Sequence, residues 1–239
     1  MASRKERKEA LRRDREAREQ AARDALRRKR LVGYGAAGAL AVAVVVVLIV
    51  VLAGGGGGGG GGNEASADVL PDGGEVPDQK VEDLPKAAKA AVCQLKSVKG
   101  KPGQHTQDPT ERIRYDTNPP TTGKHYIEPA ADQAYSQSPP DEQLVHTEEH
   151  GRVIVWFKPT LPKSTRANLK ALFEEDNYQM VLTPRRDMPY TVAATAWNGE
   201  PAPNGAGRLL VCESFSPAAF DAIRAFRDEH RGNGPEPVP

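Results

Sequence analysis

The sequence predicts an α+β fold, in which a mixed β-sheet with covering helices is preceded by a single transmembrane helix. Two observations point to this class. Residues 31–53 form an uncharged apolar run near the start of the chain. In the C-terminal half, apolar runs of strand length alternate with amphipathic segments in the order β-α-β-β-(β)-α. That order is typical of helices packed against a mixed sheet.

The apolar run is long enough to cross a membrane as a helix. Its 23 residues span about 34 Å at ~1.5 Å per residue, which exceeds the ~30 Å hydrocarbon core of a bilayer. A cleaved signal peptide is the competing interpretation, because Val51 and Ala53 are small residues that suit a cleavage point. The apolar run is, however, longer than the roughly 7–15 residues that such peptides use, so we expect an uncleaved signal anchor.

The charges on the two sides of this run predict its orientation. Residues 1–30 contain 13 Lys and Arg against 6 Asp and Glu, a net charge of +7, whereas residues 54–239 contain 20 against 26, a net charge of −6. Positively charged flanks stay in the cytoplasm. The sequence therefore predicts a single-pass plasma-membrane protein with a cytoplasmic N-terminus and an extracytoplasmic C-terminal domain.

Residues 1–30 are predicted to form a basic cytoplasmic helix, because Ala, Leu, Arg and Glu favour helices. Such a helix would contact anionic lipids of the bilayer, with each basic residue contributing ~1 kcal/mol near the surface. The alternative is a helix surrounded by water. Acidic residues are interspersed among the basic ones, so no nucleic-acid partner is expected, and the sequence identifies no protein partner.

Two further segments follow the anchor. Residues 54–84 begin with a run of glycines and continue with Pro, Gly and acidic residues, a composition typical of a disordered linker. Residues 85–239 then form one extracytoplasmic α+β domain of ordinary size. It contains both cysteines of the chain, Cys93 and Cys212. An oxidising compartment favours a disulfide between them, and two buried free thiols are the alternative.

Helices and strands alternate along this domain. A first helix is expected at residues 85–95, because proline suits its first turn. The run RVIVWF at 152–157 is almost wholly apolar, which predicts a central strand. Further strands are expected at residues 113–115, 178–183, 190–197 and 208–212.

Two longer helices complete the domain. One is predicted at residues 162–177, with Ser164 or Thr165 as its cap. The last helix is predicted to be capped by Ser216, and His230 near its end would place a positive charge at the helix C-terminus. Its expected buried stripe consists of Phe220, Ile223 and Phe226.

The stretch LVHTEEHGRV contains two histidines four positions apart. It is not the zinc-protease motif HExxH, because Thr147 stands where that motif requires glutamate. In a helix, His146, Glu149 and His150 would lie on one face. In a strand, His146, Glu148 and His150 would do so. Either arrangement can present two imidazoles to one ion, and the sequence leaves both open.

A metal site needs at least a third ligand. His125 in the loop NPPTTGKHY is the first choice, and His105 is a weaker candidate. Nitrogen and carboxylate ligands suit zinc, or copper outside the cell. The predicted metal ligands are His125, His146, His150 and Glu149. The alternative is that these histidines hydrogen-bond to the backbone and order the loops.

The loop before His125 is a second candidate surface. Its prolines restrict the backbone, and its glycine permits a close approach. The residues expected to face a ligand are Asn118, Pro119, Pro120, Gly123 and Tyr126. The alternative is a structural turn.

No catalytic residue is identified from the sequence. The G-x-S-x-G elbow, the S-x-x-K motif and the phosphate-binding loop are all missing from the chain. Glu148 or Glu149 would suit a general base, but no partner nucleophile accompanies them. Whether the protein is an enzyme stays open, and the sequence favours a protein without catalysis.

Several of these stretches together resemble the bacterial DUF3105 family of the membrane-anchored, actinobacterial type. The resemblance covers residues 90–236 and lies in NPPTTGKHY, VHTEEHGRVIVWF, VAATAW and the final GPE. It implies a domain tethered by one N-terminal transmembrane helix. The positions of interest that it implies are His125, His146, Glu149, His150 and Trp197. The family has no established activity, so the resemblance supports the architecture alone.

The leading hypothesis is therefore a single-pass protein whose outer domain binds a metal ion or small ligand through its histidine motifs. A metal-dependent enzyme of the cell envelope, with Glu149 as base, is one alternative. A structural or interaction module of the envelope is the other.

Overall fold

The structure is a computed structural model in which residues 69–238 are described. These residues belong to one compact unit. The predicted basic helix at 1–30, the predicted anchor at 31–53 and the glycine run of the linker lie outside the described residues. Within residues 69–238, none of the helices is both long and apolar enough to cross a bilayer.

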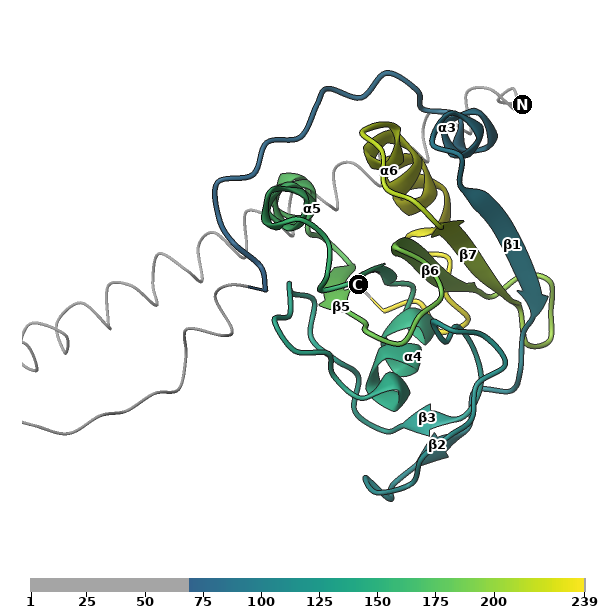
Figure 1. The fold of residues 1–239 in the computed structure, drawn as a ribbon. Helices are drawn as coiled ribbons and strands as arrows, with labels where there is room; N and C mark the ends of the chain where they lie inside the picture. The colour runs from purple at the N-terminus through teal and green to yellow at the C-terminus, as the bar shows by residue number, and fades with distance from the viewer. Residues whose placement is uncertain (1–68, 239) are drawn as a thin grey trace, which may run out of the picture. The chain divides into compact units, whose positions relative to one another are not determined.

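A five-stranded mixed sheet forms the centre of the domain, in the order β1-β7-β6-β4-β5 (Figure 1). Its strands are β1 (Gln94–Lys99), β4 (Val153–Phe157), β5 (Met180–Pro184), β6 (Val192–Asn198) and β7 (Ala206–Cys212). The helix α5 (Lys163–Glu175) connects β4 to β5, which run parallel, while every other neighbouring pair is antiparallel. The predicted α+β class with a mixed sheet is confirmed.

The central strand β4 carries apolar side chains on both faces of the sheet. Val153, Val155 and Phe157 join the core on one face, as strand alternation requires. Ile154 and Trp156 join a second core on the opposite face. All five residues are buried, which explains the unbroken apolar run in the sequence.

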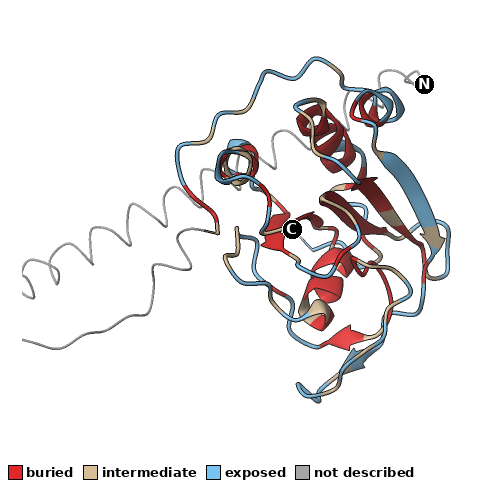
Figure 2. Cartoon of the chain, viewed as in Figure 1, coloured by how far each residue is buried: buried red, intermediate tan, exposed pale blue. Residues whose placement is uncertain are grey.

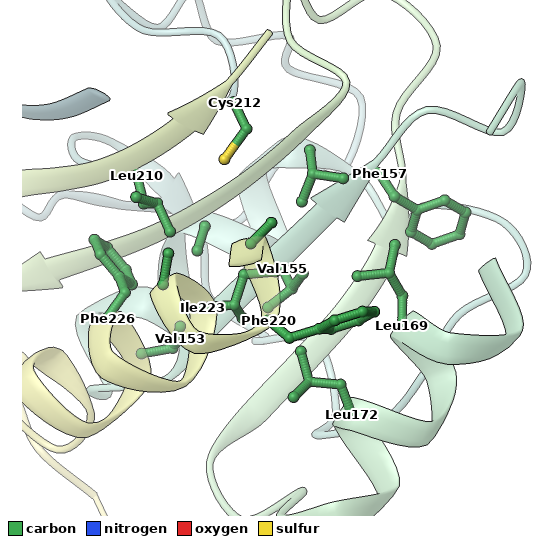
Figure 3. Close-up of a cluster of buried hydrophobic side chains, with 14 of the residues drawn as sticks. Val153, Val155, Phe157, Leu169, Leu172, Leu210, Cys212, Phe220, Ile223 and Phe226 are labelled. Atoms are coloured by element: carbon green, nitrogen blue, oxygen red, sulfur yellow. The ribbon is translucent and has the colours of Figure 1, made fainter. Parts of the chain in front are cut away.

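Three helices cover the first of these faces, namely α3 (Leu84–Ala90), α5 and α6 (Ala218–His230). Figure 2 shows their inner sides buried against the sheet, and Figure 3 shows the side chains that fill the space between them. Among these side chains are Leu169, Leu172, Phe220, Ile223 and Phe226. The apolar stripe predicted for the last helix is therefore buried against the sheet, as expected.

Among residues 69–238, one helix, α4 (Asp141–Glu149), covers the opposite face, with loops and a short two-stranded ribbon around it. Leu144 of α4 packs in the same core as Trp156. The ribbon pairs β2 (His105–Thr106) with β3 (His125–Tyr126) in parallel, and β3 contacts α4. The histidine-bearing segments therefore meet on this face.

Two predicted elements differ from the structure. The helix predicted at 85–95 ends at Ala90, because the chain turns at Val92, whose φ is 56°, before β1 begins. Residues 113–115 do not form a strand. The backbone amide of Ile113 donates to the Glu142 carboxylate instead of to a neighbouring strand.

The hydroxyl caps predicted for two helices are wrong. Pro162 precedes α5 and Pro217 precedes α6, and neither helix has a side-chain cap. Proline is suited to this place because its backbone is already restricted and it has no N–H group to satisfy. Ser164, Thr165 and Ser216 therefore do not act as caps.

His230 does not supply the positive charge that was predicted for the end of α6. Burial, with the charge of Arg208, lowers the pKa of His230 to about 4, so the ring is neutral at pH 7. The Asn198 side-chain amide donates to its Nδ1 atom at 3.2 Å, which also favours the neutral ring.

The folded domain begins before its predicted boundary. The described residues of the predicted linker, 69–83, lie against α5 and α6. Asp221 accepts a hydrogen bond from the backbone amide of Val81 at 3.1 Å, and Arg224 donates to the carbonyl of Pro77 at 2.9 Å. Because buried polar groups need partners, these two side chains of α6 hold the segment in place.

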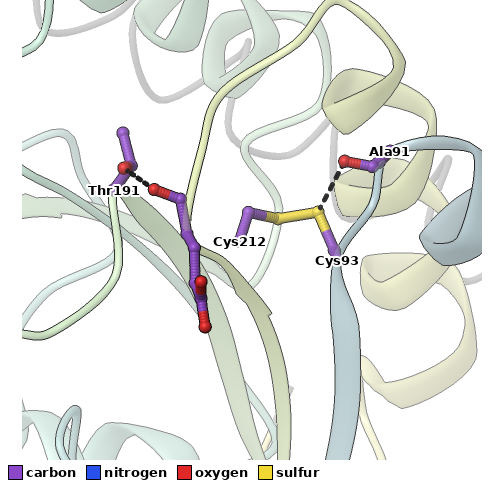
Figure 4. The surroundings of a disulfide bond; sticks show 5 residues. Ala91, Cys93, Thr191 and Cys212 are labelled. Carbon is purple, nitrogen blue, oxygen red and sulfur yellow. Dashed lines mark hydrogen bonds between the residues drawn. A yellow bond between two sulfur atoms is a disulfide. The ribbon is translucent and has the colours of Figure 1, made fainter.

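A disulfide joins Cys93, just before β1, to Cys212, at the end of β7 (Figure 4). The two Cα atoms are 4.4 Å apart, and the bond connects positions 119 residues apart in the sequence. Cys212 is fully buried in the first core. The predicted pairing is confirmed, and it ties the edge strand β1 to its neighbour.

Replacing both cysteines by alanine is expected to lower the unfolding free energy by about 2–5 kcal/mol. A bond across so long a loop lowers the conformational entropy of the unfolded chain. Its removal raises that entropy and so stabilises the unfolded state. Urea denaturation with and without reductant measures the effect. Reductant should lower the midpoint of the wild type and leave the Cys93→Ala/Cys212→Ala variant unchanged. Equal sensitivity of the two proteins to reductant would contradict the prediction.

Candidate metal centre

The HTEEH stretch is helical. α4 begins after Pro140 and ends at Glu149, and His150 follows as its cap residue. Gly151, with φ of 84°, then turns the chain toward β4. Helical spacing therefore puts His146, Glu149 and His150 on one face, and the strand alternative is wrong.

The ribbon brings two more histidines beside this face. His105 of β2 and His125 of β3 are register partners, so their rings lie side by side. The His125 amide donates to the carbonyl of Gln104 at 2.9 Å, and the Ile127 amide donates to that of Thr106 at 3.2 Å. These two bonds hold the short strands in parallel register.

His105, His125, His146 and Glu149 form a compact cluster, in which one ligand atom of each lies within 4.8 Å of the others. The Nε2 atoms of His105 and His146 are 3.4 Å apart. Oε2 of Glu149 lies 3.0 Å from Nε2 of His125 and 3.9 Å from Nε2 of His105. His125 is fully buried, whereas the side chain of His105 is 38% exposed.

Two atoms of the cluster are buried without a hydrogen bond. They are Nε2 of His125 and Oε2 of Glu149. They face each other at 3.0 Å without a hydrogen bond between them. Buried polar atoms almost always have a partner. A cation coordinated by both atoms would provide the partner that each of them lacks.

Backbone carbonyls orient two of the imidazoles. Nδ1 of His125 donates to the carbonyl of Gly123 at 2.8 Å, and Nδ1 of His146 donates to that of Tyr126 at 2.8 Å. Each bond selects the tautomer whose Nε2 carries a lone pair, which is how metal-binding histidines are commonly held. Gly123 has φ of 122°, a conformation that other residues rarely adopt, so glycine is needed at this carbonyl.

Trp197 and Gly103 enclose the cluster. The Trp197 ring lies edge-on to His125 with centroids 6.2 Å apart, and its Nε1 atom donates to the carbonyl of Asn204 at 2.9 Å. A Cβ atom on Gly103 would lie 1.8 Å from Oε1 of Glu149. A side chain at this position would therefore displace the carboxylate.

The shifted pKa values of His146, Glu149 and the neighbouring His150 suit a metal ion. Burial, followed by the charges of the neighbouring histidines, lowers the pKa of His146 to about 4. Burial and the charge of Arg152 also lower the pKa of His150. Burial by itself would raise the pKa of Glu149, but its contact with the His125 side chain, together with the other histidines beside it, lowers that pKa. Neutral imidazoles and an ionised carboxylate are the forms that bind metals.

Glu148 has the opposite character although it is adjacent to Glu149. Its side chain is fully buried near Thr195 of β6, and neither carboxylate oxygen has a hydrogen-bond partner. Burial raises the pKa of Glu148 well above its usual value, and Thr195 offsets this only in part. A neutral carboxyl group in this position is not a metal ligand.

His150 lies at the edge of the cluster. Its Nε2 atom is 3.1 Å from Nε2 of His146. His150 belongs to a second set, with Glu149 and Glu236, whose ligand atoms also lie within 4.8 Å of one another. Glu149 is the residue that both sets share.

The loop that was predicted to face a ligand packs against the domain. Its Asn118 side chain makes hydrogen bonds of 2.6 and 3.0 Å to the segment after β5, and Pro119 and Pro120 are buried. Gly123 and Tyr126 reach the cluster through their backbone carbonyls. This arrangement favours the structural-turn alternative, in which the loop positions the histidines.

Three of the four predicted metal ligands come together in the structure, namely His125, His146 and Glu149. His150 is their neighbour and joins the second set. His105, the weaker sequence candidate, takes the remaining place. A two-residue strand has no periodic pattern, so only its pairing with His125 reveals this role.

A family model described as a protein of unknown function (DUF3105) matches residues 105–239, more than half of the chain. The chain belongs to the DUF3105 family. The part that matches DUF3105 begins at His105 and includes every residue of both ligand sets, while α3, β1 and Cys93 precede it. No curated protein and no solved structure matches the chain.

Replacing Glu148 by glutamine is expected to raise the unfolding free energy above pH 4.5, by an amount that grows with pH. In the unfolded chain the carboxyl loses its proton near pH 4.5, whereas the folded state retains it to a higher pH because the folded pKa is raised. The wild type therefore loses stability as pH rises through this interval, and a neutral amide does not.

Urea denaturation at pH 4 and pH 8, in the presence of a chelator, measures this difference. The exposed Glu213→Gln variant is the control and should follow the wild type at both pH values. Identical pH profiles for Glu148→Gln and the wild type would show that Glu148 is not a buried neutral acid.

Proposed function

We propose that this domain binds a transition-metal ion through His105, His125, His146 and Glu149. The observation that carries the proposal is the convergence of four ligand atoms, from β2, β3 and α4, within 4.8 Å of one another. Two of these atoms are buried and have no hydrogen-bond partner. Hydrogen bonding among histidines, the alternative, leaves both atoms unsatisfied.

The distances and ligand types support zinc or copper. Four ligands around zinc at ~2.0–2.1 Å in a tetrahedron are about 3.3 Å apart. The separations of 3.0, 3.4 and 3.9 Å within the cluster surround this value. Imidazole nitrogens suit zinc and copper, while magnesium and calcium prefer oxygen ligands.

Four protein ligands around one ion favour binding over catalysis. Structural zinc sites are closed by four protein ligands, whereas catalytic sites retain an open position for water. The Glu149 carboxylate takes the fourth position here. We therefore infer a domain that holds a metal ion, with no catalytic residue assigned.

A metal-dependent enzyme is the second candidate function. The side chain of His105 is 38% exposed, so solvent can approach one side of the cluster. If Glu149 leaves the ion, three histidines and a water remain, and Glu149 then becomes a base. The two candidate functions therefore differ in the role of Glu149, which is a metal ligand in the binding domain and a base in the enzyme.

We further propose that the domain lies outside the cytoplasm, anchored by residues 31–53, with the basic residues 1–30 near anionic lipids on the inner side. The charge asymmetry of the chain supports this orientation. The disulfide between Cys93 and Cys212 also supports it, because such bonds persist in oxidising compartments.

The full-length chain is expected to bind zinc or copper. His146→Ala is expected to weaken binding by roughly 100-fold or more, because losing a ligand should lower metal affinity at least as much as losing a residue that hydrogen-bonds to a ligand. Competition against a chromogenic chelator measures the affinity. His230→Gln, which changes a buried histidine outside the cluster, is the matched control and should bind like the wild type.

Glu149→Gln separates the two candidate functions. A loss of affinity comparable to that of His146→Ala indicates that Glu149 is a ligand, as proposed. Unchanged affinity favours the enzyme alternative. A wild-type chain that takes up no metal would refute both.

The proposed orientation is tested by tagging each end of the full-length chain and adding protease to intact cells. The protease should digest the C-terminal tag and leave the N-terminal tag intact, because it cannot cross the membrane into the cytoplasm. Protection of both tags until the cells are lysed would contradict the proposed topology.

A further inference from the structure

The C-terminal tail runs beside the end of α4. The Glu236 amide donates to the carbonyl of Glu149 at 3.1 Å, and the Gly232 amide donates to that of Gly151 at 2.8 Å. A Cβ atom on Gly234 would lie 2.2 Å from the carbonyl oxygen of Glu149, so the tail passes too close for a side chain there. The tail therefore has a defined position at the cluster.

This position brings the Glu236 carboxylate to His150 and Glu149. One ligand atom from each of the three residues lies within 4.8 Å of the others. The Glu236 side chain is exposed, but its backbone bond to α4 limits where the carboxylate can reach. The Glu236 carboxylate is therefore restricted to the region of His150 and Glu149, unlike a surface acid on an unrestrained segment.

We propose that the centre is binuclear, with a second divalent cation bound by His150 and Glu236 and with Glu149 as the ligand that both ions share. The proposal rests on the proposed function, because the first ion occupies the cluster described above. A carboxylate has two oxygens and can serve one ion with each. The Glu149 side chain is 3% exposed, and its Oε2 atom has no hydrogen-bond partner.

A single ion with five ligands fits the contacts less well. His150 is close to His146, with Nε2 atoms 3.1 Å apart, yet it is not in the set that contains His105 and His125. The ligand atoms instead form two sets, and Glu149 is the residue common to both. In known two-metal sites the ions are about 3.5–4 Å apart, and such a spacing is compatible with one shared carboxylate.

The positive charge of Arg152 near His150 does not prevent a second cation. The Arg152 guanidinium lies 3.2 Å from the carboxylate of Asp132 and donates to the carbonyls of His150 and Val238. Its charge is thus partly balanced before any ion binds. Glu236 then supplies negative charge to the second ion, because it is not a ligand of the first.

The second ion would have fewer protein ligands than the first, and one of them, His150, borders a cavity. A cavity of about 290 Å³ borders His150 and is also lined by Thr147 and Arg152. Three protein ligands leave at least one coordination position for water or a small anion. The second ion therefore has fewer protein ligands than the first and is the more exchangeable of the two.

The test is a titration of the metal-free full-length chain with zinc, followed by gel filtration and elemental analysis. The wild type is expected to retain two ions per chain, and Glu236→Gln is expected to retain one, with at least a tenfold loss of affinity for the second. His150→Ala should behave in the same way. Glu213→Gln, an exposed acid outside both ligand sets, is the control and should retain two.

The same proteins loaded with copper give a second readout. Two copper(II) ions that share a carboxylate couple magnetically, so the wild type should show less paramagnetic signal than its copper content predicts, and Glu236→Gln should show the full signal of one ion.

The outcomes separate the two proposals. One ion per wild-type chain overturns the binuclear centre and leaves the proposed function intact. Two ions in both the wild type and Glu236→Gln overturn the assignment of the second site. No retained ion at all overturns the proposed function itself.

Discussion

Two backbone carbonyls, those of Gly123 and Tyr126, determine the geometry of the candidate metal centre. Each accepts a hydrogen bond from the Nδ1 atom of a histidine and so leaves Nε2 with a lone pair. The Tyr126 carbonyl also links β3 to α4, because the ring that it holds belongs to His146. The stacking of the His125 and His146 rings, with centroids 4.7 Å apart, depends on this link.

α4 separates two kinds of acid on its two sides. Glu148 and Glu149 are adjacent in the sequence, but burial raises the pKa of the first, and the imidazoles beside the second lower its pKa. Successive helical residues differ by about 100° around the axis, so one side chain faces the sheet and the next faces the histidines. Of these two adjacent acids, only Glu149 on the metal-binding side is ionised, while the neutral Glu148 is buried near Thr195 of β6.

The parts of the fold that local spacing encodes were predictable, and those that depend on distant pairing were not. The apolar run in the sequence predicts β4, whereas HTEEH suited a helix and a strand alike, and the structure selects the helix that puts His146 and Glu149 on one face. The role of His105 depends on a parallel partner 20 positions later, in a strand of two residues. β1 was missed because QLKSVK is mostly exposed and has lysines among its residues. Glu236 lies in an irregular tail, whose path is decided by contacts with the end of α4.

β1 is an edge strand with little hydrophobic burial, and this has a consequence for solubility. Its exposed Lys96 and Lys99 disfavour pairing with the sheet of another molecule. The strand covers the edge of β7, whose Leu209 and Val211 are buried. Since burial holds β1 weakly, the disulfide at Cys93 keeps this cover in place. Without this bond, the backbone pairing with β7 alone would hold the charged strand at the edge of the sheet.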